Sequence, residues 1–525
     1  MRIEKKIIFA VTGLLFAFVM SLLLFYAEKL HVYTIRALPC SNLRILFAGL
    51  LLNIILITII YKLRKKTELI LERTAKWIVP AIVIILLVYE MIFTYSSYFY
   101  TDWDPAGLID AAEKIARGNT EDISIGYISA HPNNRFLIWI YLIIFKITIF
   151  FTGNCQIMSI IWIQCLLTSL TCFLIYRLLR KLGNSRTFSF CVFMAASIYI
   201  GMSPWLNVPY SDEAVLILPL YLLYLYIKRT DMFSWIIIGL LTAVGYAIKP
   251  QVVLMTIAMI AYSVLQRLCG VRKRGKEGSF ECAAGFLAAI FIFLLVLNGT
   301  ILPSLNLNLD VTKEFGISHY FMMGLNHDTD GVYSNEDTEY TASFENKHAR
   351  NSADIDLAKR RIRDYGAAGT VRHFIRKLIV NYGDGSFAWG INGNFFAGRP
   401  EGMNTIFTDF FTDIIYDSGS RFKDGLMLAQ GIWLQILLGS MLVFIKIFSK
   451  EKESEKDHSD AMAIISLSLI GITAFEQTFE ALSRYLFIYS PLFLLLAADG
   501  CRSEVRLIRT VSEQLQRLRS VPGSE

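Results

Sequence analysis

Charged residues are scarce in this chain. They make up 18% of its 525 residues, whereas a soluble domain averages about 25%. Hydrophobic residues make up 54%, and they gather in blocks that match the roughly 17–25 residues of a membrane helix. The composition excludes a single water-soluble core and predicts an all-α polytopic membrane protein.

Paired cysteines are also lacking. None of the eight cysteines stands in a C-x-x-C pair or a Cys/His cluster, which argues against a zinc site. The longest hydrophilic segment, 302–424, contains no cysteine and is therefore held together without disulfides. The first apolar run is not followed by a small-residue cleavage site, so we interpret 1–27 as a first span that is kept.

The apolar residues form thirteen blocks along the chain. They lie near 7–27, 43–61, 77–98, 136–152, 156–176, 187–203, 212–228, 233–249, 250–268, 280–301, 425–448, 460–478 and 484–500. Basic residues concentrate at 62–76, 177–186, 267–276 and in the C-terminal tail. The positive-inside rule places these stretches and both termini in the cytoplasm. The net charge of +7 thus indicates topology, and no nucleic-acid partner is expected.

Two termini on one side require an even number of spans, so one block must lie on the membrane. We select 136–152, because a span there would put the basic stretch 177–186 outside. The block also contains Lys146, whose ammonium an interfacial helix can leave in water. The prediction is a bundle of about 12 transmembrane helices plus this interfacial helix. The alternative is an ordinary span in which Lys146 snorkels.

Five regions follow from this topology. They are two N-terminal helices with a basic cytoplasmic loop (1–76), a transmembrane core (77–301) with a first outer loop (99–155), a mixed extracytoplasmic insertion (302–424), C-terminal transmembrane helices (425–500) and a basic cytoplasmic tail (501–525). In the insertion we expect helices at 353–364 and 371–382, separated at Gly366. The second helix has an apolar face and a cationic face, as in a helix that rests on the outer leaflet.

The first outer loop opens with two carboxylates, Asp102 and Asp104, directly after a span. In an extended stretch, residues two apart point to the same side. Both side chains would then converge on one acceptor hydroxyl, as a general base, or on one metal ion. The alternative for Asp104 is a helix N-cap before Pro105, with the helix ending at Gly118.

Further polar groups stand at the outer ends of other blocks. His131, Asn133 and Asn134 either close over a sugar or form a turn into the next helix. Tyr210, Asp212 and Glu213 stand at the start of the next span. Carboxylates at this position also interact favourably with the helix dipole, without any function. Both stretches are candidates for substrate binding.

Two cations are candidates for binding a phosphate. Lys249 stands at the end of a helical block, where a lysine is favourable without any function, and it is also a good point charge for a phosphate. Glu476, Glu480 and Arg484 are spaced by four and share one face if the helix continues. Arg484 either forms a structural ion pair or grips a phosphate with its guanidinium fork.

These motifs, in this order, resemble the GT-C superfamily of membrane glycosyltransferases, and in particular Gram-positive bacterial members. The resemblance is carried by 101–105, 131–135, 209–213, 248–250 and 484–486, and in the insertion by 321–326, 331–334 and 384–389. It implies an outer-face cavity in which Asp102 or Asp104 is the catalytic base or metal ligand. Lys249 and Arg484 would contact the lipid phosphate. Two extra N-terminal spans and the position of the insertion depart from the usual pattern.

The resemblance implies a hexosyltransferase of the plasma membrane, acting in cell-envelope biogenesis. The donor would be a polyprenyl-phosphate-linked sugar, and the acceptor a cell-envelope glycan, lipid or protein. A single displacement would invert the anomeric configuration. The cofactor is left open, since two aspartates are compatible with Mg²⁺ or Mn²⁺ without requiring it. The alternative functions are a polysaccharide polymerase or a lipid or oligosaccharide transporter of the cell envelope.

Overall fold

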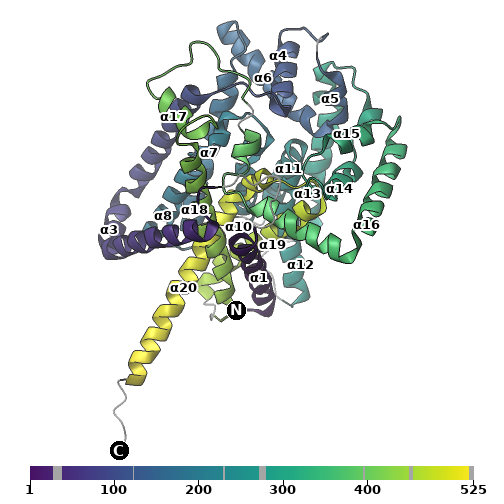
Figure 1. Cartoon of the computed structure of the whole chain (residues 1–525). Coiled ribbons are helices and arrows are strands. Elements are labelled where there is room, and N and C mark those ends of the chain that lie inside the picture. The colour runs from purple at the N-terminus through teal and green to yellow at the C-terminus, as the bar shows by residue number, and fades with distance from the viewer. Residues whose placement is uncertain are drawn as a thin grey trace, which may run out of the picture.

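The computed structural model describes residues 1–27, 38–121, 123–228, 231–270, 280–393, 396–448 and 453–519. Within these ranges the chain is helical and contains no strand (Figure 1). The one β-type pairing found there is an isolated antiparallel bridge between Tyr100 and Gly398. The predicted all-α architecture is therefore confirmed for the described residues.

The helices have the following bounds. The α-helices are α1 (Ile3–Phe25), α3 (Asn42–Ser97), α4 (Asp104–Ala116), α5 (Ile125–Ala130), α6 (Arg135–Thr152), α7 (Ile157–Lys181), α8 (Arg186–Tyr199), α9 (Ser211–Val215), α10 (Ile217–Lys228), α11 (Met232–Ile248), α12 (Val253–Leu268), α13 (Phe280–Val296), α14 (Ile317–Gly324), α15 (Asn335–Ala342), α16 (Lys347–Tyr382), α17 (Thr408–Ile415), α18 (Phe422–Met441), α19 (Lys456–Thr478) and α20 (Ser490–Arg519). Short 3-10 or π segments are η1 (Pro132–Asn134), η2 (Pro204–Asn207), η3 (Pro250–Val252), η4 (Leu297–Ile301), η5 (Pro303–Leu305), η6 (Val311–Lys313), η7 (Trp389–Gly393), η8 (Leu442–Phe448), η9 (Glu453–Glu455) and η10 (Ser483–Tyr489).

Ten helical stretches of the described chain are long and apolar enough to cross a membrane. Two shorter apolar helices, α8 and α11, coincide with two further predicted blocks. The remaining block, 212–228, is divided into α9 and α10. All thirteen apolar blocks are thus helical. Ten of the helical stretches are long enough to span a membrane, and the total of twelve spans stays a prediction.

The predicted cytoplasmic loop within 62–76 is not a loop. Helix α3 continues through it as one helix of 56 residues. In Figure 1 its first part runs across the lower half of the molecule and its second part rises toward α17. The segment is rich in Leu, Lys, Arg and Glu, which have high helix propensity, so its charges do not interrupt the helix.

The molecule has two ends of different character. Both termini lie at one end, and α4 and α6 lie at the other (Figure 1). Ion pairs between helices gather at the end with the termini, where Lys5 Nζ lies 2.5 Å from Asp460 Oδ1 and His458 Nε2 lies 2.6 Å from Asp499 Oδ1. Lys446 also pairs with Asp499.

Helix α6, the predicted interfacial helix, packs on α4. Its buried face includes Leu137, Tyr141 and Phe145, whereas Lys146 and Phe150 are exposed. Its length and composition also allow a span. The interfacial position of this helix therefore stays a prediction.

The insertion is helical within its described residues, so the expectation of a mixed segment was wrong there. The predicted break at Gly366 is confirmed, because this residue has φ +61° inside α16. The cationic face of the second half is divided between solvent and protein, since Arg372 on this face is exposed. His373 and Lys377 are fully buried against the protein, and the apolar Val371 is 58% exposed. Tertiary hydrogen bonds therefore decide which face of this helix turns inward.

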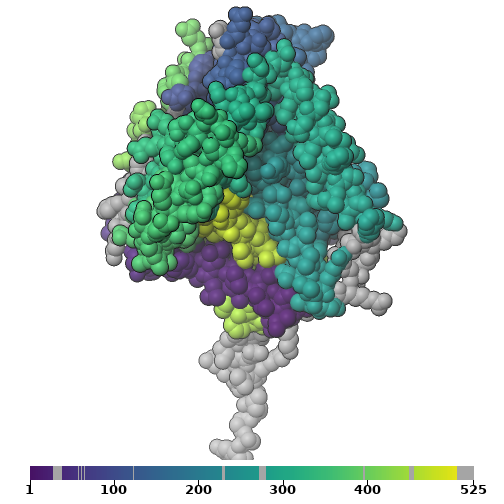
Figure 2. Space-filling view, turned by 90° about the vertical axis from the view of Figure 1, so that its right-hand side faces the viewer, coloured from purple at the N-terminus to yellow at the C-terminus, as the bar shows by residue number. Residues whose placement is uncertain are grey.

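The side of the molecule that carries α16 is hollowed. Figure 2 shows a recess between the green segment of α16 and teal segments from the middle of the chain. Yellow atoms of the C-terminal helices are visible at its floor. This recess opens to the side of the helix bundle.

Candidate active site

Asp104 lies in the first turn of α4 and points toward the protein. Trp103 is the N-cap and Asp104 is the first residue of the helix, so the N-cap interpretation of Asp104 was wrong. Instead Tyr210 Oη donates to Asp104 Oδ2 at 3.0 Å. The helix does end as predicted, with Gly118 at φ +77°.

Asp102 does not join Asp104. Its side chain is exposed, whereas that of Asp104 is half-buried. The prediction that both point to one side assumed an extended chain, but the backbone bends at Asp102 and Trp103 before α4 begins. The bend turns one carboxylate inward and leaves the other in solvent.

The second predicted motif borders the same group. Asn134 Nδ2 donates to Tyr127 Oη at 2.9 Å, and Asn133 Nδ2 donates to Asn134 Oδ1 at 3.3 Å. The rings of Tyr127 and His131 lie 4.5 Å apart. Burial raises the pKa of the Tyr127 phenol, and the nearby charge of Asp104 raises it further. The phenol therefore remains a hydrogen-bond donor beside this carboxylate.

His131 is held neutral by its surroundings. Burial lowers the pKa of its imidazole, and the charge of Asp104 opposes this with a smaller effect. The stretch 132–134 also forms the turn η1 that leads into α6. The turn interpretation of this motif is confirmed, whereas contact of these side chains with a sugar stays a prediction.

Asp212 lies between the two predicted phosphate-binding cations. Its Oδ1 lies 2.5 Å from Lys249 Nζ and its Oδ2 lies 3.7 Å from Arg484 Nε. All three side chains are buried. Lys249 is the C-cap of α11 and Asp212 is in the first turn of α9, so both charges also match the helix dipoles.

Aromatic rings surround Arg484. Its guanidinium carbon lies 4.4 Å from the ring centroid of Trp103, 5.2 Å from Tyr210, 5.5 Å from Tyr485 and 5.6 Å from Trp205. Cation–π attraction holds an arginine in this way without using its hydrogen-bond donors. The fork of Arg484 is thus positioned by packing and stays able to bind an anion.

Glu480 completes the group. Tyr485 Oη donates to Glu480 Oε1 at 2.7 Å. Burial raises the pKa of the Glu480 carboxyl, and the hydrogen bond from Tyr485 opposes this. The phenol of Tyr320, on α14, also faces Glu480 and Asp104, and burial followed by these charges raises its pKa.

The predicted shared helical face of Glu476, Glu480 and Arg484 is wrong. Helix α19 ends at Thr478 and the next helical segment, η10, begins at Ser483. Arg484 therefore lies beside Asp212 rather than one turn from Glu480.

Several buried polar atoms of this region have no hydrogen-bond partner among the described protein atoms. They include both carboxylate oxygens of Glu213 and of Glu476, and Nε and Nη1 of Arg484. A buried polar group left unsatisfied costs about 1–3 kcal/mol. A bound polar ligand or ordered water would satisfy these atoms.

Five ring-bearing residues of the site were not predicted from the sequence. Trp103 and Tyr485 lie inside the recognised stretches 101–105 and 484–486, and Trp205 lies four residues before 209–213, so proximity to these motifs was a usable signal. Tyr127 and Tyr320 lie outside those motifs and have no local signature. They reach the site only because α5 and α14 pack there.

Metal ligation finds no support in the side-chain geometry. In the ranges that the structure describes, no group of three or more His, Cys, Asp or Glu side chains is arranged to hold a metal ion. Asp102 and Asp104, the suggested ligand pair, point apart. The chemistry below is therefore derived from the protein side chains.

A family model for conserved hypothetical integral membrane proteins matches residues 5–503. The chain belongs to that family. A search among curated proteins finds no match. Membership and the ten apolar helices together make this an integral membrane protein with several transmembrane helices. The family description assigns no activity, so the function is argued from the site.

Proposed function

We propose that this protein is a GT-C-type glycosyltransferase that acts at the outer face of a bacterial, Gram-positive plasma membrane. It moves a hexose from a polyprenyl-phosphate donor to an acceptor of the cell envelope. One observation carries the proposal. Tyr210 links the half-buried Asp104 to Arg484, because its hydroxyl donates to Asp104 Oδ2 at 3.0 Å and the Arg484 guanidinium carbon lies 5.2 Å from its ring centroid. Arg484 and Lys249 in turn flank Asp212. Such a site offers a base, a sugar-stacking surface and anion-binding groups together.

Asp104 is the proposed general base. Its carboxylate is oriented by Tyr210 Oη at 3.0 Å and faces the phenol of Tyr127. It accepts the proton of an acceptor hydroxyl while the hydroxyl oxygen attacks the anomeric carbon. The bond from this carbon to the phosphate oxygen breaks, and polyprenyl phosphate leaves with the electron pair. One displacement inverts the anomeric configuration.

Arg484 and Lys249 are the proposed partners of the leaving phosphate. Asp212 pairs with both cations, and the charges of Glu480 and Asp104 also act on Arg484. The Nη1 donor of Arg484 has no partner among the described atoms. Charge-assisted hydrogen bonds to a phosphate become stronger as its negative charge develops, which stabilises the transition state.

The hollow beside α16 supports a membrane-bound donor. The recess opens to the side of the bundle, and its floor is formed by the C-terminal helices (Figure 2). The segment η10, which carries Arg484, belongs to this part of the chain. A polyprenyl chain could lie in the membrane while its phosphate reaches Arg484.

The decisive experiment compares Asp104→Asn with Asp102→Asn in membrane vesicles supplied with radiolabelled polyprenyl-phosphate hexoses. General-base removal lowers the transfer rate by about 10²–10⁴-fold, so we expect that loss for Asp104→Asn. Asp102→Asn is the matched control and keeps the wild-type rate, because Asp102 is exposed outside the site. Equal rates in all three proteins at equal expression would reject Asp104 as the base.

A second candidate is transport of a lipid or oligosaccharide. The buried charges of Asp212, Lys249 and Arg484 lie where helices are interrupted, at α9, η3 and η10, and secondary transporters bind substrates at such breaks. If wild-type vesicles move a labelled lipid-linked sugar across the membrane without consuming it, this function replaces the transferase.

A further inference from the structure

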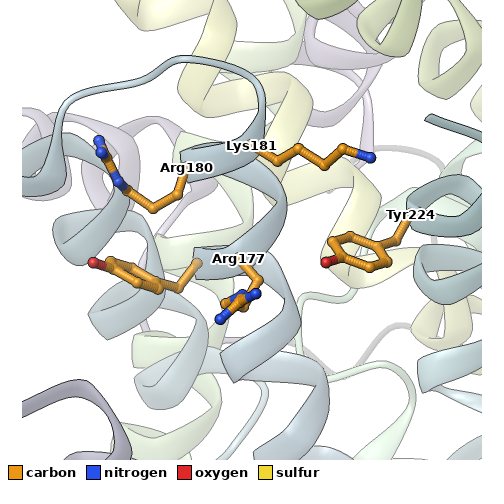
Figure 3. A pocket seen from close by; sticks show the side chains of 5 residues that line it. Arg177, Arg180, Lys181 and Tyr224 are labelled. Atoms are coloured by element: carbon orange, nitrogen blue, oxygen red, sulfur yellow. The ribbon is translucent and has the colours of Figure 1, made fainter. Parts of the chain in front are cut away.

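A second hollow lies at the other end of the molecule. It has a volume of about 380 Å³ and is lined by Tyr176, Arg177, Arg180, Lys181 and Tyr224. Its three cations all belong to the last two turns of α7, and Tyr224 belongs to α10. Figure 3 shows Lys181 and Tyr224 on one side of α7 and Arg180 turned to the opposite side. No residue of the proposed active site contributes to it.

Contacts of the following loop place this hollow at the end with both termini. Asn184, three residues after α7, lies 3.4 Å from His458 Nδ1 and accepts a hydrogen bond from Arg502. His458 pairs with Asp499, which also pairs with Lys446. The hollow is therefore on the side that the basic stretches predict to be cytoplasmic, opposite Asp104.

An apolar stripe on α7 leads into this hollow. Ile163, Leu166 and Leu170 are 43%, 43% and 37% exposed. Phe173, Arg177 and Lys181 continue the same spacing of three or four residues, which keeps all six side chains on one helical face. The Arg177 guanidinium lies 5.9 Å from the centre of the Phe173 ring. The face is apolar over several turns and ends in two cations.

The three cations of the hollow differ in their contacts with the rest of the protein. Arg180 donates to the Asn184 carbonyl and interacts with the charge of Glu68. Lys181 Nζ lies 5.3 Å from the centre of the Tyr224 ring, and Arg177 is exposed. Arg177 and Lys181 are therefore the two that continue the apolar stripe.

We propose that this groove binds an anionic phospholipid. Its phosphate lies at Arg177 and Lys181, and one acyl chain follows Leu170, Leu166 and Ile163. Basic pockets between membrane helices recognise such head groups. A basic helix end required only by topology would not need the hollow between α7 and α10. The exposed apolar stripe, which any lipid-facing span has, brings an acyl chain to the rim of this hollow.

The test is native mass spectrometry of the full-length protein, purified in detergent and supplied with phosphatidylglycerol or phosphatidylcholine. Wild type should retain phosphatidylglycerol selectively. Arg177→Gln/Lys181→Gln should weaken retention by roughly 25-fold, from about fivefold for each cation. Lys65→Gln/Lys66→Gln is the matched control, because it removes two exposed cations from α3 and should retain the lipid as wild type does.

Several results would overturn the proposal. Equal losses of phosphatidylglycerol retention in both double variants would show that diffuse surface charge holds the lipid. No loss of retention in either variant would show that the groove does not bind it. Equal retention of phosphatidylcholine by wild type would exclude an anionic ligand without any variant. Displacement of the lipid by soluble glycerol phosphate at the same concentration would show that a soluble anion occupies the groove. These outcomes do not depend on the glycosyltransferase proposal.

Discussion

At the scale of single residues, the site depends on which of two similar carboxylates turns inward. Asp102 and Asp104 are two positions apart and equally plausible from the sequence. The bend before α4 sends only Asp104 toward Tyr210 and Tyr127. The bend therefore favours Asp104 over Asp102 for the proposed role of base.

Lys377 is a second residue whose role is visible only in the structure. Its Nζ donates to the carbonyl oxygens of Gly324, Gln477 and Phe479 at 2.9, 3.0 and 2.6 Å. These contacts tie α16 to α14 and to the segment that leads to Glu480. Lys377 is therefore a positioning residue for the outer end of the molecule.

Replacement of Lys377 should loosen this connection. We expect Lys377→Met to destabilise the protein by on the order of 2–4 kcal/mol, because three buried carbonyl groups lose their donor. The measurement is the midpoint of thermal unfolding in detergent. Arg372→Met is the control, since Arg372 is exposed on the same helix. Identical midpoints for both variants would show that these hydrogen bonds contribute nothing.

At the scale of elements, α14 and α16 form the core of the insertion and contain two buried histidines. His373 Nε2 lies 2.9 Å from the Gly324 carbonyl, and His319 Nδ1 lies 2.8 Å from Thr341 Oγ1. Burial lowers the pKa of both imidazoles to about 4. The folded insertion thus holds both rings neutral.

Acid should therefore destabilise the insertion. A folded pKa of about 4, below the ordinary 6.5, means that the unfolded state binds more protons between these values. The contribution of each neutral histidine to the free energy of unfolding is complete above pH 6.5. It is lost as the pH falls toward 4, by up to about 3 kcal/mol for each histidine.

The check is the unfolding midpoint as a function of pH. The wild type should lose stability between pH 7 and 5, and His319→Gln/His373→Gln should lose less over the same interval. His348→Gln, an exposed position of α16, is the control and should behave as wild type. A double variant as acid-sensitive as the wild type would contradict the argument.

At the scale of the whole molecule, the two functions that we propose lie at opposite ends. The Asp104 site lies at the end of α4, and the basic groove lies at the end with both termini. This arrangement suits an enzyme whose chemistry faces outward and whose lipid contact faces the cytoplasm. The two proposals therefore need one orientation in the membrane.

That orientation predicts the labelling of cysteines in intact cells. Ser343→Cys lies on the exposed surface of the insertion and should react with a membrane-impermeant maleimide. Cys269 is exposed at the end of α12, on the side of the termini, and should react only after permeabilisation. Each should be the single cysteine of its variant. Labelling of Cys269 in intact cells would reverse the topology.

The sequence alone determined where the apolar helices lie, that the chain is an all-α membrane protein, and which segments contribute candidate residues. The break at Gly366 and the end of α4 at Gly118 were also predictable, because hydropathy and glycine act locally. The continuity of α3 was missed, since charge was given more weight than helix propensity.

Only the tertiary structure decided which residues meet. Arg484 lies beside Asp212 and among four aromatic rings, Lys377 turns inward, and Asp102 stays outside. The contacts of Arg484 and Lys377 join segments that are far apart in the chain, whereas the bend before α4 keeps Asp102 outside. Local pattern carries no information about such contacts, because the energy of a buried charge is set by the partners that the fold brings to it.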